Sequence, residues 1–327
     1  MSVLVTGGAG YIGSHMVYAL LDAGERVVVL DNLSTGLREL VSPDAIFVEG
    51  DVADRQLVEE LLTAWAISEV FHFAGSVVVP ESIENPLLYY RNNTAASRAL
   101  IETSVERGVQ RFIFSSTAAI YGQPSAAASD PIGEDAEKRP VNPYGRSKLM
   151  TEWMLDDVAN ASDLRYAALR YFNVAGADPG GRTGQSTPRA THLIKRASQA
   201  ALGKVPYLGI FGTDYPTPDG TGIRDYIHVS DIVNVHALAL AHLRDGGASI
   251  TLNCGYGHGF SVREVVASVE RVSRRPVPVR ELPRREGDPP SVVSDPRRLK
   301  EQLRWSPRYD DLDQIVRNAL VWESRLG

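Results

Sequence analysis

Two side chains four residues apart, Tyr144 and Lys148, are the first candidates for chemistry in this sequence. They follow Pro143 at the start of a stretch with helical character, and residues four apart on a helix lie on the same face. A phenol has a pKa of about 10 and is a poor base near neutral pH, but a neighbouring ammonium group stabilises the phenolate and lowers that pKa. The pair is therefore a candidate for proton transfer, with Tyr144 as acid and base.

Hydroxyl side chains precede this helix in the chain. Ser115, Ser116 and Thr117 follow the run Arg111-Phe-Ile-Phe114, which predicts a strand that ends at residue 114. Ligands of open α/β sheets bind beyond the carboxyl ends of the strands, so these hydroxyls are expected to face a ligand. A Tyr-x-x-x-Lys pair occurs by chance in many helices, and its meaning depends on the elements around it.

The elements that would position these groups start near the N-terminus. Val3 to Val5 predict a short buried strand, four glycines crowd the turn over residues 7–13, and a helical pattern covers residues 11–21. This strand, glycine turn and helix predict half of a dinucleotide-binding unit, because glycines allow a tight turn and let a pyrophosphate approach the backbone. The exposed N–H groups and the positive end of the helix would hold the phosphates.

An acidic residue follows the second predicted strand, which covers residues 26–30. Asp31 lies about 20 residues past the glycines, where a carboxylate accepts hydrogen bonds from the adenosine ribose. The same charge would repel a ribose 2′-phosphate, which favours NAD over NADP. The alternative is that Asp31 is only a turn residue before Asn32.

Alternation of predicted strands and helices continues beyond Asp31. Further strands are expected at residues 45–48, 69–73 and 165–169, and one long helix is expected at residues 87–107. Such alternation is typical of the α/β class with a parallel sheet. We therefore predict a Rossmann-type, doubly wound parallel sheet with a smaller C-terminal α/β substrate lobe.

The predicted division of the chain follows from where this pattern loosens. An NAD-binding domain is expected over residues 1–172, with residues 226–255 packing back onto it, and residues 173–327 are expected to form mainly a substrate-binding lobe.

Composition limits the partners. The 327 residues are 43% hydrophobic and carry a net charge of −6, which gives no reason to expect nucleic acid or an anionic membrane as a partner. The single cysteine, Cys254, cannot form an internal disulfide or a cysteine metal site, and this fits a reducing compartment. No apolar run reaches the ~20 residues that span a bilayer, and the N-terminal strand has no charged leader. We therefore expect a cytoplasmic protein without a metal.

Three arginines and a histidine have two interpretations each. Arg170, Arg224 and Arg285 either form surface salt bridges or, where two Arg-bearing loops converge, hold a second phosphate group. His72, inside a predicted strand, is expected to be a packed core histidine rather than a catalytic base.

Several stretches spread over the chain share the pattern of a known family. They are VTGGAGYIGSH (5–15), LDNLS (30–34), HFAG (72–75), FIFSST (112–117), PYGRSK (143–148), LRYFN (169–173), DGTGIRDYIH (219–228) and RREGD (284–288). With them the chain resembles the UDP-glucose 4-epimerase family of the extended short-chain dehydrogenases/reductases. The last three stretches mark the nucleotide-sugar 4-epimerase branch.

The resemblance implies an isomerase of carbohydrate metabolism that interconverts UDP-glucose and UDP-galactose. It implies that NAD stays bound through turnover, that Tyr144 takes the proton of the sugar 4-hydroxyl while C4 gives hydride to NAD, and that Thr117 hydrogen-bonds that hydroxyl. Lys148 would anchor the nicotinamide ribose. The resulting 4-keto sugar turns over while the UDP group stays bound. The resemblance also implies a homodimer.

Two sets of binding residues follow from the same resemblance. The cofactor set is Gly7, Gly10, Tyr11, Ile12, Gly13, Asp31, Asn32, Leu33, Ser34, Thr35, Gly36, Asp51, Val52, Phe73, Ala74, Gly75, Ser76, Asn92, Ser115, Tyr144, Lys148 and Phe172. The substrate set is Thr117, Tyr144, Asn173, His192, Leu193, Phe211, Arg224, Arg285, Asp288 and Val292.

Departures from the family pattern affect the substrate contacts. Val77 stands where many relatives have lysine, which removes one cation from the phosphate region. His192 and Lys195 stand where an asparagine and a proline are usual. Val292 replaces a frequent tyrosine at the back of the sugar pocket, so we predict room for a 2-acetamido group.

Three other functions are alternatives to UDP-glucose 4-epimerisation. A 4,6-dehydratase needs an acid beside the site hydroxyl, and Ala118 and Ala119 follow Thr117 instead. An epimerase for UDP-xylose, UDP-arabinose or UDP-glucuronate remains open. A non-catalytic NAD-binding sensor would need the glycines but neither Tyr144 nor Lys148.

Overall fold

The computed structural model of the protein describes residues 2–123, 131–187, 190–285 and 287–327. The chain divides into two compact units, each assembled from separate segments. The first unit comprises Met1–Gly122, Lys138–Arg170 and Val233–Leu252, and the second comprises Gln123–Glu137, Tyr171–Ile232 and Asn253–Gly327. None of the helices in the described ranges is long and apolar enough to cross a membrane.

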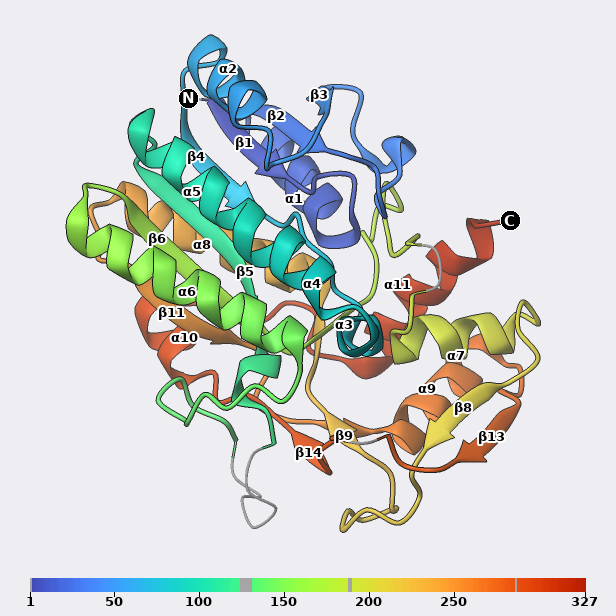
Figure 1. Ribbon diagram of the computed structural model, residues 1–327. Helices are drawn as coiled ribbons and strands as arrows, with labels where there is room; N and C mark the ends of the chain where they lie inside the picture. Colours follow the sequence, from blue (N-terminus) through green and yellow to red (C-terminus); the bar gives the residue numbers. More distant parts are fainter. Residues whose placement is uncertain (1, 124–130, 188–189, 286) are drawn as a thin grey trace. The chain divides into compact units, whose positions relative to one another are not determined.

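A seven-stranded sheet forms the centre of the first unit (Figure 1). Its strands, in spatial order, are β11 (Ile250–Cys254), β6 (Arg165–Tyr171), β5 (Arg111–Thr117), β4 (Ile67–His72), β1 (Ser2–Thr6), β2 (Arg26–Asp31) and β3 (Ile46–Glu49). β1 pairs in parallel with β2 and β4, and the pairs β2–β3 and β4–β5 are also parallel. The sheet is therefore the doubly wound type predicted from the sequence.

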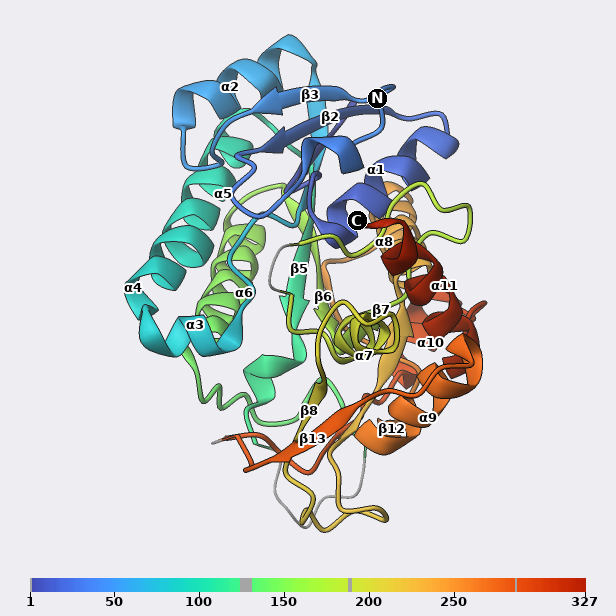
Figure 2. The ribbon, with the colours of Figure 1, turned by 90° about the vertical axis from the view of Figure 1, so that its right-hand side faces the viewer.

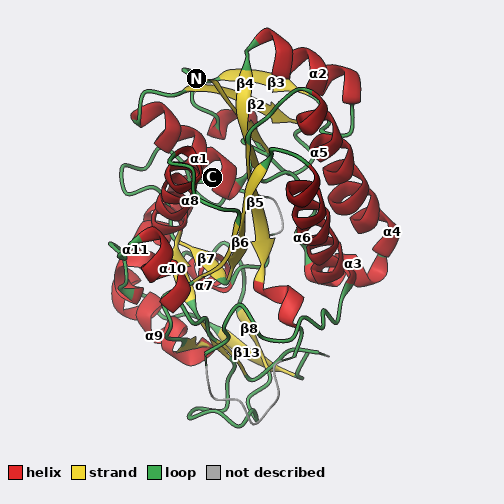
Figure 3. Ribbon diagram, turned by 90° about the vertical axis from the view of Figure 1, so that its left-hand side faces the viewer, coloured by secondary structure: helices red, strands yellow, loops and turns green. Residues whose placement is uncertain are grey.

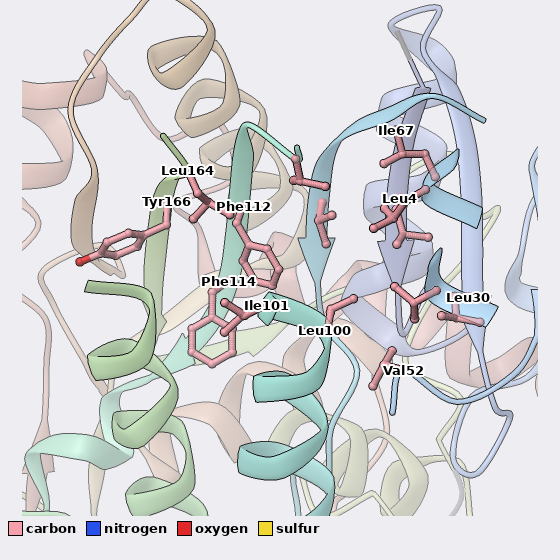
Figure 4. Close-up of a cluster of buried hydrophobic side chains, with 14 of the residues drawn as sticks. Leu4, Leu30, Val52, Ile67, Leu100, Ile101, Phe112, Phe114, Leu164 and Tyr166 are labelled. Atoms are coloured by element: carbon pink, nitrogen blue, oxygen red, sulfur yellow. The ribbon is translucent and has the colours of Figure 1, made fainter. Parts of the chain in front are cut away.

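Helices cover both faces of this sheet, which explains why its strands are apolar on both sides. On one face lie α2 (Arg55–Ala64), α5 (Ala96–Glu106) and α6 (Pro143–Ala161), and on the other lie α1 (Tyr11–Asp22) and α8 (Val229–Arg244) (Figures 1 and 3). Figure 4 shows the core under the first face, where Leu100 of α5 packs with Leu4, Phe112 and Phe114 of the strands. This packing fixes the strand ends from which the predicted site residues project.

The order in which strands are added to the sheet changes direction at β1. The chain continues from β1 to its neighbour β2 and then β3 on one side, and crosses to β4 on the other. Ligands of such sheets bind where this reversal occurs, outside the carboxyl ends of the strands. The turns after β1 and β4 are the glycine turn and the segment Phe73–Ser76, both predicted to contact the cofactor.

The prediction of one continuous helix over residues 87–107 is wrong, because a π-helical segment interrupts it. A separate helix α3 (Val79–Glu84) precedes it, and the expected helix consists of α4 (Pro86–Tyr89), a π-helical segment (Tyr90–Ala95) and α5. A sequence pattern of 3.6-residue period does not distinguish one wider turn from α-helix, and π-helical turns are common at functional sites.

The second unit contains three small sheets and four helices in its described residues (Figure 2). The sheets pair β7 (Asn173–Ala175) with β10 (Tyr226–His228), β8 (Leu208–Phe211) with β13 (Val279–Leu282), and β9 (Ile223–Arg224) with both β12 (Phe260–Ser261) and β14 (Ser291–Val292). The helices are α7 (Leu193–Ala201), α9 (Val262–Ser273), α10 (Arg297–Leu303) and α11 (Leu312–Arg325). Short 3₁₀ segments, Arg38–Leu40 and Ala118–Tyr121, belong to the first unit.

Candidate active site

In the glycine turn after β1, the fold itself requires glycine at residues 7 and 13 but not at residue 10. Gly7 has φ +71°, and a Cβ there would lie 2.5 Å from the amide nitrogen of Ala74. A Cβ at Gly13 would lie 2.1 Å from the carbonyl oxygen of Gly7. Gly10 has an ordinary extended backbone, φ −83° and ψ 176°, and its Cβ would meet only that same carbonyl, at 3.2 Å.

The space beside Gly10 suits an anion. Gly10 caps α1 without a side-chain hydrogen bond, and the first turn of α1 carries no acidic residue. The positive end of the helix dipole and its backbone N–H groups are therefore not countered by a local carboxylate. These residues fit the pyrophosphate of a dinucleotide, whose close approach a side chain at residue 10 would prevent.

Asp31 at the end of β2 is both a turn residue and a carboxylate available to a ribose. Its two oxygens accept hydrogen bonds from the backbone N–H groups of Ala9 and Leu33, each 2.9 Å long. Burial raises the pKa of this carboxyl group, and the two backbone hydrogen bonds oppose the rise. A carboxylate has about four acceptor positions, so two remain for ribose hydroxyls. Asn32 donates to Asp51 at 2.9 Å, and this bond links the segment after β2 to the segment after β3, both of which contain predicted cofactor residues.

The segment after β4 is held by asparagines of the π-helical segment. Asn93 is 2% exposed; its amide oxygen accepts from the Ser76 N–H at 2.7 Å, and its amide nitrogen donates to the Ser76 carbonyl at 3.0 Å and to Ser147 at 3.1 Å. Asn92 donates to the Ser76 hydroxyl at 3.1 Å. The wider turn thus directs two neighbouring amides to one loop, and Asn93 also reaches the helix that carries Tyr144 and Lys148.

Tyr144 and Lys148 lie near the start of α6, as predicted. The Asn142 side chain accepts from the Gly145 N–H at 2.8 Å and caps the helix. A Cβ on Gly145 would lie 2.6 Å from the Ala119 carbonyl oxygen, so glycine lets the helix start pack against the 3₁₀ segment after β5. This close packing brings the Thr117 hydroxyl near enough to the Tyr144 phenol to lower the pKa of that phenol.

The β5 hydroxyls lie within the strand and not beyond it, because β5 continues through Thr117. Thr117 is buried, and its hydroxyl oxygen also accepts from the Ala119 N–H at 3.1 Å. Lys148 is 3% exposed and donates from Nζ to the Ser115 carbonyl at 2.9 Å. Its ammonium group lies 4.8 Å from the centroid of the Phe114 ring.

Burial dominates the protonation equilibria of this site. It lowers the pKa of Lys148 to about 8. It also raises the pKa of Tyr144, and the nearby Thr117 hydroxyl opposes this rise. The expectation that an ammonium group together with a nicotinamide ring lowers the phenol pKa stays a prediction. The phenolate therefore requires further positive charge, such as that of an oxidised nicotinamide ring.

His72 is a packed core residue, as expected. It is 1% exposed and lies 2.7 Å from the Thr6 hydroxyl and 2.8 Å from the Ser97 hydroxyl. Burial, followed by the charge of Lys148, lowers the pKa of His72 to about 3, so it is neutral at physiological pH.

In the second unit, Arg224, Asp288 and Val292 lie together. Arg224 ends β9 and forms a salt bridge with Asp288. Val292 of β14 is paired with Arg224 in the parallel register of the two strands. A cation on the central strand, its carboxylate partner and a small apolar side chain on the neighbouring strand therefore lie close together.

A second pair joins an arginine to an aromatic ring. The Arg285 guanidinium lies 3.7 Å from the centroid of the Phe211 ring, where β8 ends. Asn173 begins β7 and is paired with Tyr226, two residues after Arg224. His192 precedes Leu193 at the start of α7, and its Nδ1 lies 3.3 Å from the Gln185 amide nitrogen.

Known proteins of one family match this chain over most of its length. The model of the NAD dependent epimerase/dehydratase family matches residues 3–255. The chain belongs to this family. The UDP-glucose 4-epimerase of Azospirillum brasilense is 57% identical over 324 residues, which cover 99% of this chain and 92% of that protein.

Solved structures of UDP-glucose 4-epimerases are also similar to this chain. A UDP-glucose 4-epimerase from Brucella ovis in complex with NAD has a TM-score of 0.94 and 47% identity, and the match covers 98% of this chain and 97% of that one. A UDP-glucose-4-epimerase from Stenotrophomonas maltophila with bound NAD and formylated UDP-arabinopyranose has a TM-score of 0.95 and 40% identity, over 100% and 98% of the two chains. The predicted family resemblance, α/β fold and NAD cofactor are confirmed, whereas the role of each site residue stays a prediction.

Within the family's cofactor set, the structure places all residues in the first unit except Phe172, which is buried in the second. The substrate residues from Asn173 onward all lie in the second unit. Val77 is 51% exposed and supplies no cation, as its side chain dictates.

Two buried side chains near the site residues were not predicted to be buried. Arg170 was expected on the surface or at a phosphate, but it is 4% exposed and forms a salt bridge with Glu152 at 2.7 Å. Tyr215 is 5% exposed, has no hydrogen-bond partner for its hydroxyl among the described residues, and has its ring 4.3 Å below the Arg284 guanidinium. Nothing in the local pattern of either residue indicates burial, because the partners are distant in sequence.

Proposed function

We propose that this chain interconverts UDP-glucose and UDP-galactose by epimerisation at C4, with NAD bound throughout. In this proposal residues 1–172 bind NAD and residues 173–327 mainly bind the UDP-sugar. The observation that carries it is the Tyr144 phenol close to the Thr117 hydroxyl, one helical turn from a buried lysine, within a dinucleotide-binding unit. An NAD-binding sensor has no use for a buried ammonium beside a phenol.

The chemistry of this chain's own residues is proton transfer and orientation. Tyr144 Oη accepts the proton of the sugar 4-hydroxyl, and Thr117 Oγ1 orients that hydroxyl. Bound NAD supplies reversible oxidation at C4. Tyr144 holds the proton until it returns to the sugar oxygen. Burial of Thr117 and Lys148 keeps water from competing for the phenol.

The charged residues of the second unit hold the nucleotide in this proposal. Arg224 and Arg285 pair with the pyrophosphate, for which guanidinium groups are suited. The ring of Phe211 already restricts Arg285, so less side-chain entropy is lost on binding. A pyrophosphate held by two cations stays bound while a weakly held hexose turns over.

Incubation of the purified protein with separate UDP-sugars, without added NAD, tests this function. We expect UDP-galactose to give UDP-glucose, identified by chromatography and mass spectrometry, and NAD to be released on denaturation. Turnover of UDP-xylose, UDP-arabinose or UDP-glucuronate alone would establish the alternative epimerase. The sugar nucleotide in the Stenotrophomonas maltophila structure makes the pentose the first alternative to include. Absence of turnover with every sugar would favour the sensor.

We also propose a homodimer formed through the outer face of α4, α5 and α6. Leu87 and Trp153 on this face are 77% and 57% exposed. A groove between α5 and α6 is lined by apolar side chains, among them Ile101, Met154 and Val158, and by the charged residues Arg98, Glu102, Glu106 and Asp157. Light scattering should give twice the chain mass, and Trp153→Glu should give a monomer.

A cytoplasmic location is the remaining part of the proposal. Its support is the single, buried Cys254, which fits a reducing compartment. Fractionation of the source cells checks it.

A further inference from the structure

A buried ionic network lies behind the catalytic candidates of the first unit. The Arg170 guanidinium donates to the Glu152 carboxylate through Nε at 3.0 Å and through a terminal nitrogen at 2.7 Å. Its other terminal nitrogen donates to the Tyr121 hydroxyl at 2.8 Å. The Ser116 hydroxyl donates to Glu152. Four elements, β5, the 3₁₀ segment after it, α6 and β6, therefore meet in one set of hydrogen bonds.

The network is deeply buried. Arg170 and Glu152 are 4% and 6% exposed, and Ser116 and Tyr121 are 2% and 3% exposed. A buried ion pair contributes little net stability compared with apolar residues of the same volume, because removing two charges from water is costly. Stability alone is therefore a weak reason for this pair.

Its position relative to the site gives a stronger reason. Thr117 lies in the short stretch between Ser116 and Tyr121, and both ends of that stretch are bonded to the ion pair. Glu152 follows Lys148 by four residues and Tyr144 by eight, which places all three side chains along one side of α6. The same ion pair thus holds the strand end that carries Thr117 and the helix that carries Tyr144.

We propose that Arg170 and Glu152 are positioning residues that set the contact between Tyr144 and Thr117. The proposal rests on the proposed epimerase function. Both residues are buried, and each acts through Ser116, Tyr121 and the helix. Small displacements of such groups cost rate because proton transfer requires hydrogen-bond distance in the reacting complex.

The test is a pair of single variants matched for burial. Glu152→Gln removes the carboxylate that accepts from Ser116 and Arg170. Glu69→Gln removes a fully buried carboxylate that pairs with Arg111 and Arg244 near the start of β4. We expect both to lower the melting temperature. Only Glu152→Gln should lower kcat, by ~10- to 100-fold, with KM for the UDP-sugar and NAD content within twofold of the parent.

A double variant separates position from stability. Arg170→Met with Glu152→Leu replaces the pair by apolar side chains, a change that is often neutral or stabilising. We expect it to fold and still to lose kcat by ~10-fold or more, because Ser116 and Tyr121 have lost their shared partners. A crystal structure should show the Thr117 hydroxyl displaced from the Tyr144 phenol, a measurement that does not depend on turnover.

Failure of this proposal is distinct from failure of the proposed function. An active parent with full kcat in both Glu152→Gln and the double variant, or an unmoved Thr117 in the double variant, overturns the positioning role and leaves the epimerase intact. A parent inactive on all UDP-sugars overturns the epimerase, and the structure of the double variant still decides whether the network sets the Tyr144–Thr117 contact.

Discussion

The two units treat their candidate functional side chains differently. In the first unit Thr117 and Lys148 are buried and bonded to neighbouring elements. In the second unit Asn173, His192 and Arg285 are exposed, and Arg224 with Asp288 is partly exposed. Proton transfer needs a fixed distance between atoms, whereas recognition of a highly charged diphosphate tolerates side chains that adjust on binding.

This difference has an energetic side. Burying Lys148 costs stability, since it lowers the pKa of an ammonium group that stays charged at neutral pH. The exposed arginines carry no such cost. Changes in the first unit should therefore affect kcat and stability together, and changes in the second unit should affect KM.

The largest expected effect is that of Tyr144→Phe. The phenol hydroxyl is the proposed acid and base, so its loss should lower kcat by at least ~100-fold with little change in KM. Initial rates with UDP-galactose measure it. Tyr207→Phe, at a 37% exposed tyrosine of the second unit, is the control and should keep full activity. Near-normal turnover of the Tyr144 variant would remove this residue from its role.

Lys148→Met should stabilise the protein while it removes activity. The folded pKa of about 8 lies below the ordinary 10.5, so the folded state binds fewer protons between these values. Stability therefore rises with pH through this window, and the cost of the buried charge, about 3 kcal/mol, is fully present below pH 8.

Urea denaturation at several pH values checks this sign. The Lys148→Met advantage should be greatest near pH 7 and shrink as the pH rises from about 8 to about 10.5. Lys300→Met, at an exposed lysine of α10, should show no such dependence. A Lys148 variant that is less stable than the parent at pH 7 would contradict the prediction.

Arg224→Met tests the expectation that changes in the second unit affect KM. A charge-assisted hydrogen bond is worth about 1.5–3 kcal/mol, so the loss should raise KM and the Kd for UDP by roughly 10- to 100-fold. NAD content and the melting temperature should change little. Arg263→Met breaks an exposed ion pair with Glu281 and serves as the control. A fall in kcat without a rise in KM would show that Arg224 belongs to the chemistry.

Val292→Tyr should have the smallest effect. The native valine is predicted to admit a 2-acetamido group, so the parent should epimerise UDP-N-acetylglucosamine as well as UDP-galactose. A tyrosine should lower kcat/KM for the N-acetylated sugar by roughly 10-fold relative to UDP-galactose, the usual scale for steric discrimination in a pocket. A parent that turns over only UDP-galactose makes the prediction wrong.

Features encoded within a short stretch could be predicted, and those that depend on distant partners could not. The glycine turn, Asp31, and the Tyr144–Lys148 pair each have a local pattern, and the structure places them at strand or helix ends. The role of Arg170 could not be predicted, since its partner Glu152 is 18 residues away on another element. The effect of burial on the pKa of Tyr144 could not be predicted either, because burial depends on the folded surroundings of the phenol.

The π-helical segment Tyr90–Ala95 has a consequence for length variation in this chain. A π turn accommodates one residue more than an α turn, so deleting one residue there lets an ordinary α-helix form without rotating α5. Leu100 and Ile101 would keep their places in the core, and the fold would survive. The amides of Asn92 and Asn93 would then point away from Ser76, and the segment Phe73–Ser76 would lose these hydrogen bonds while the sheet remained intact.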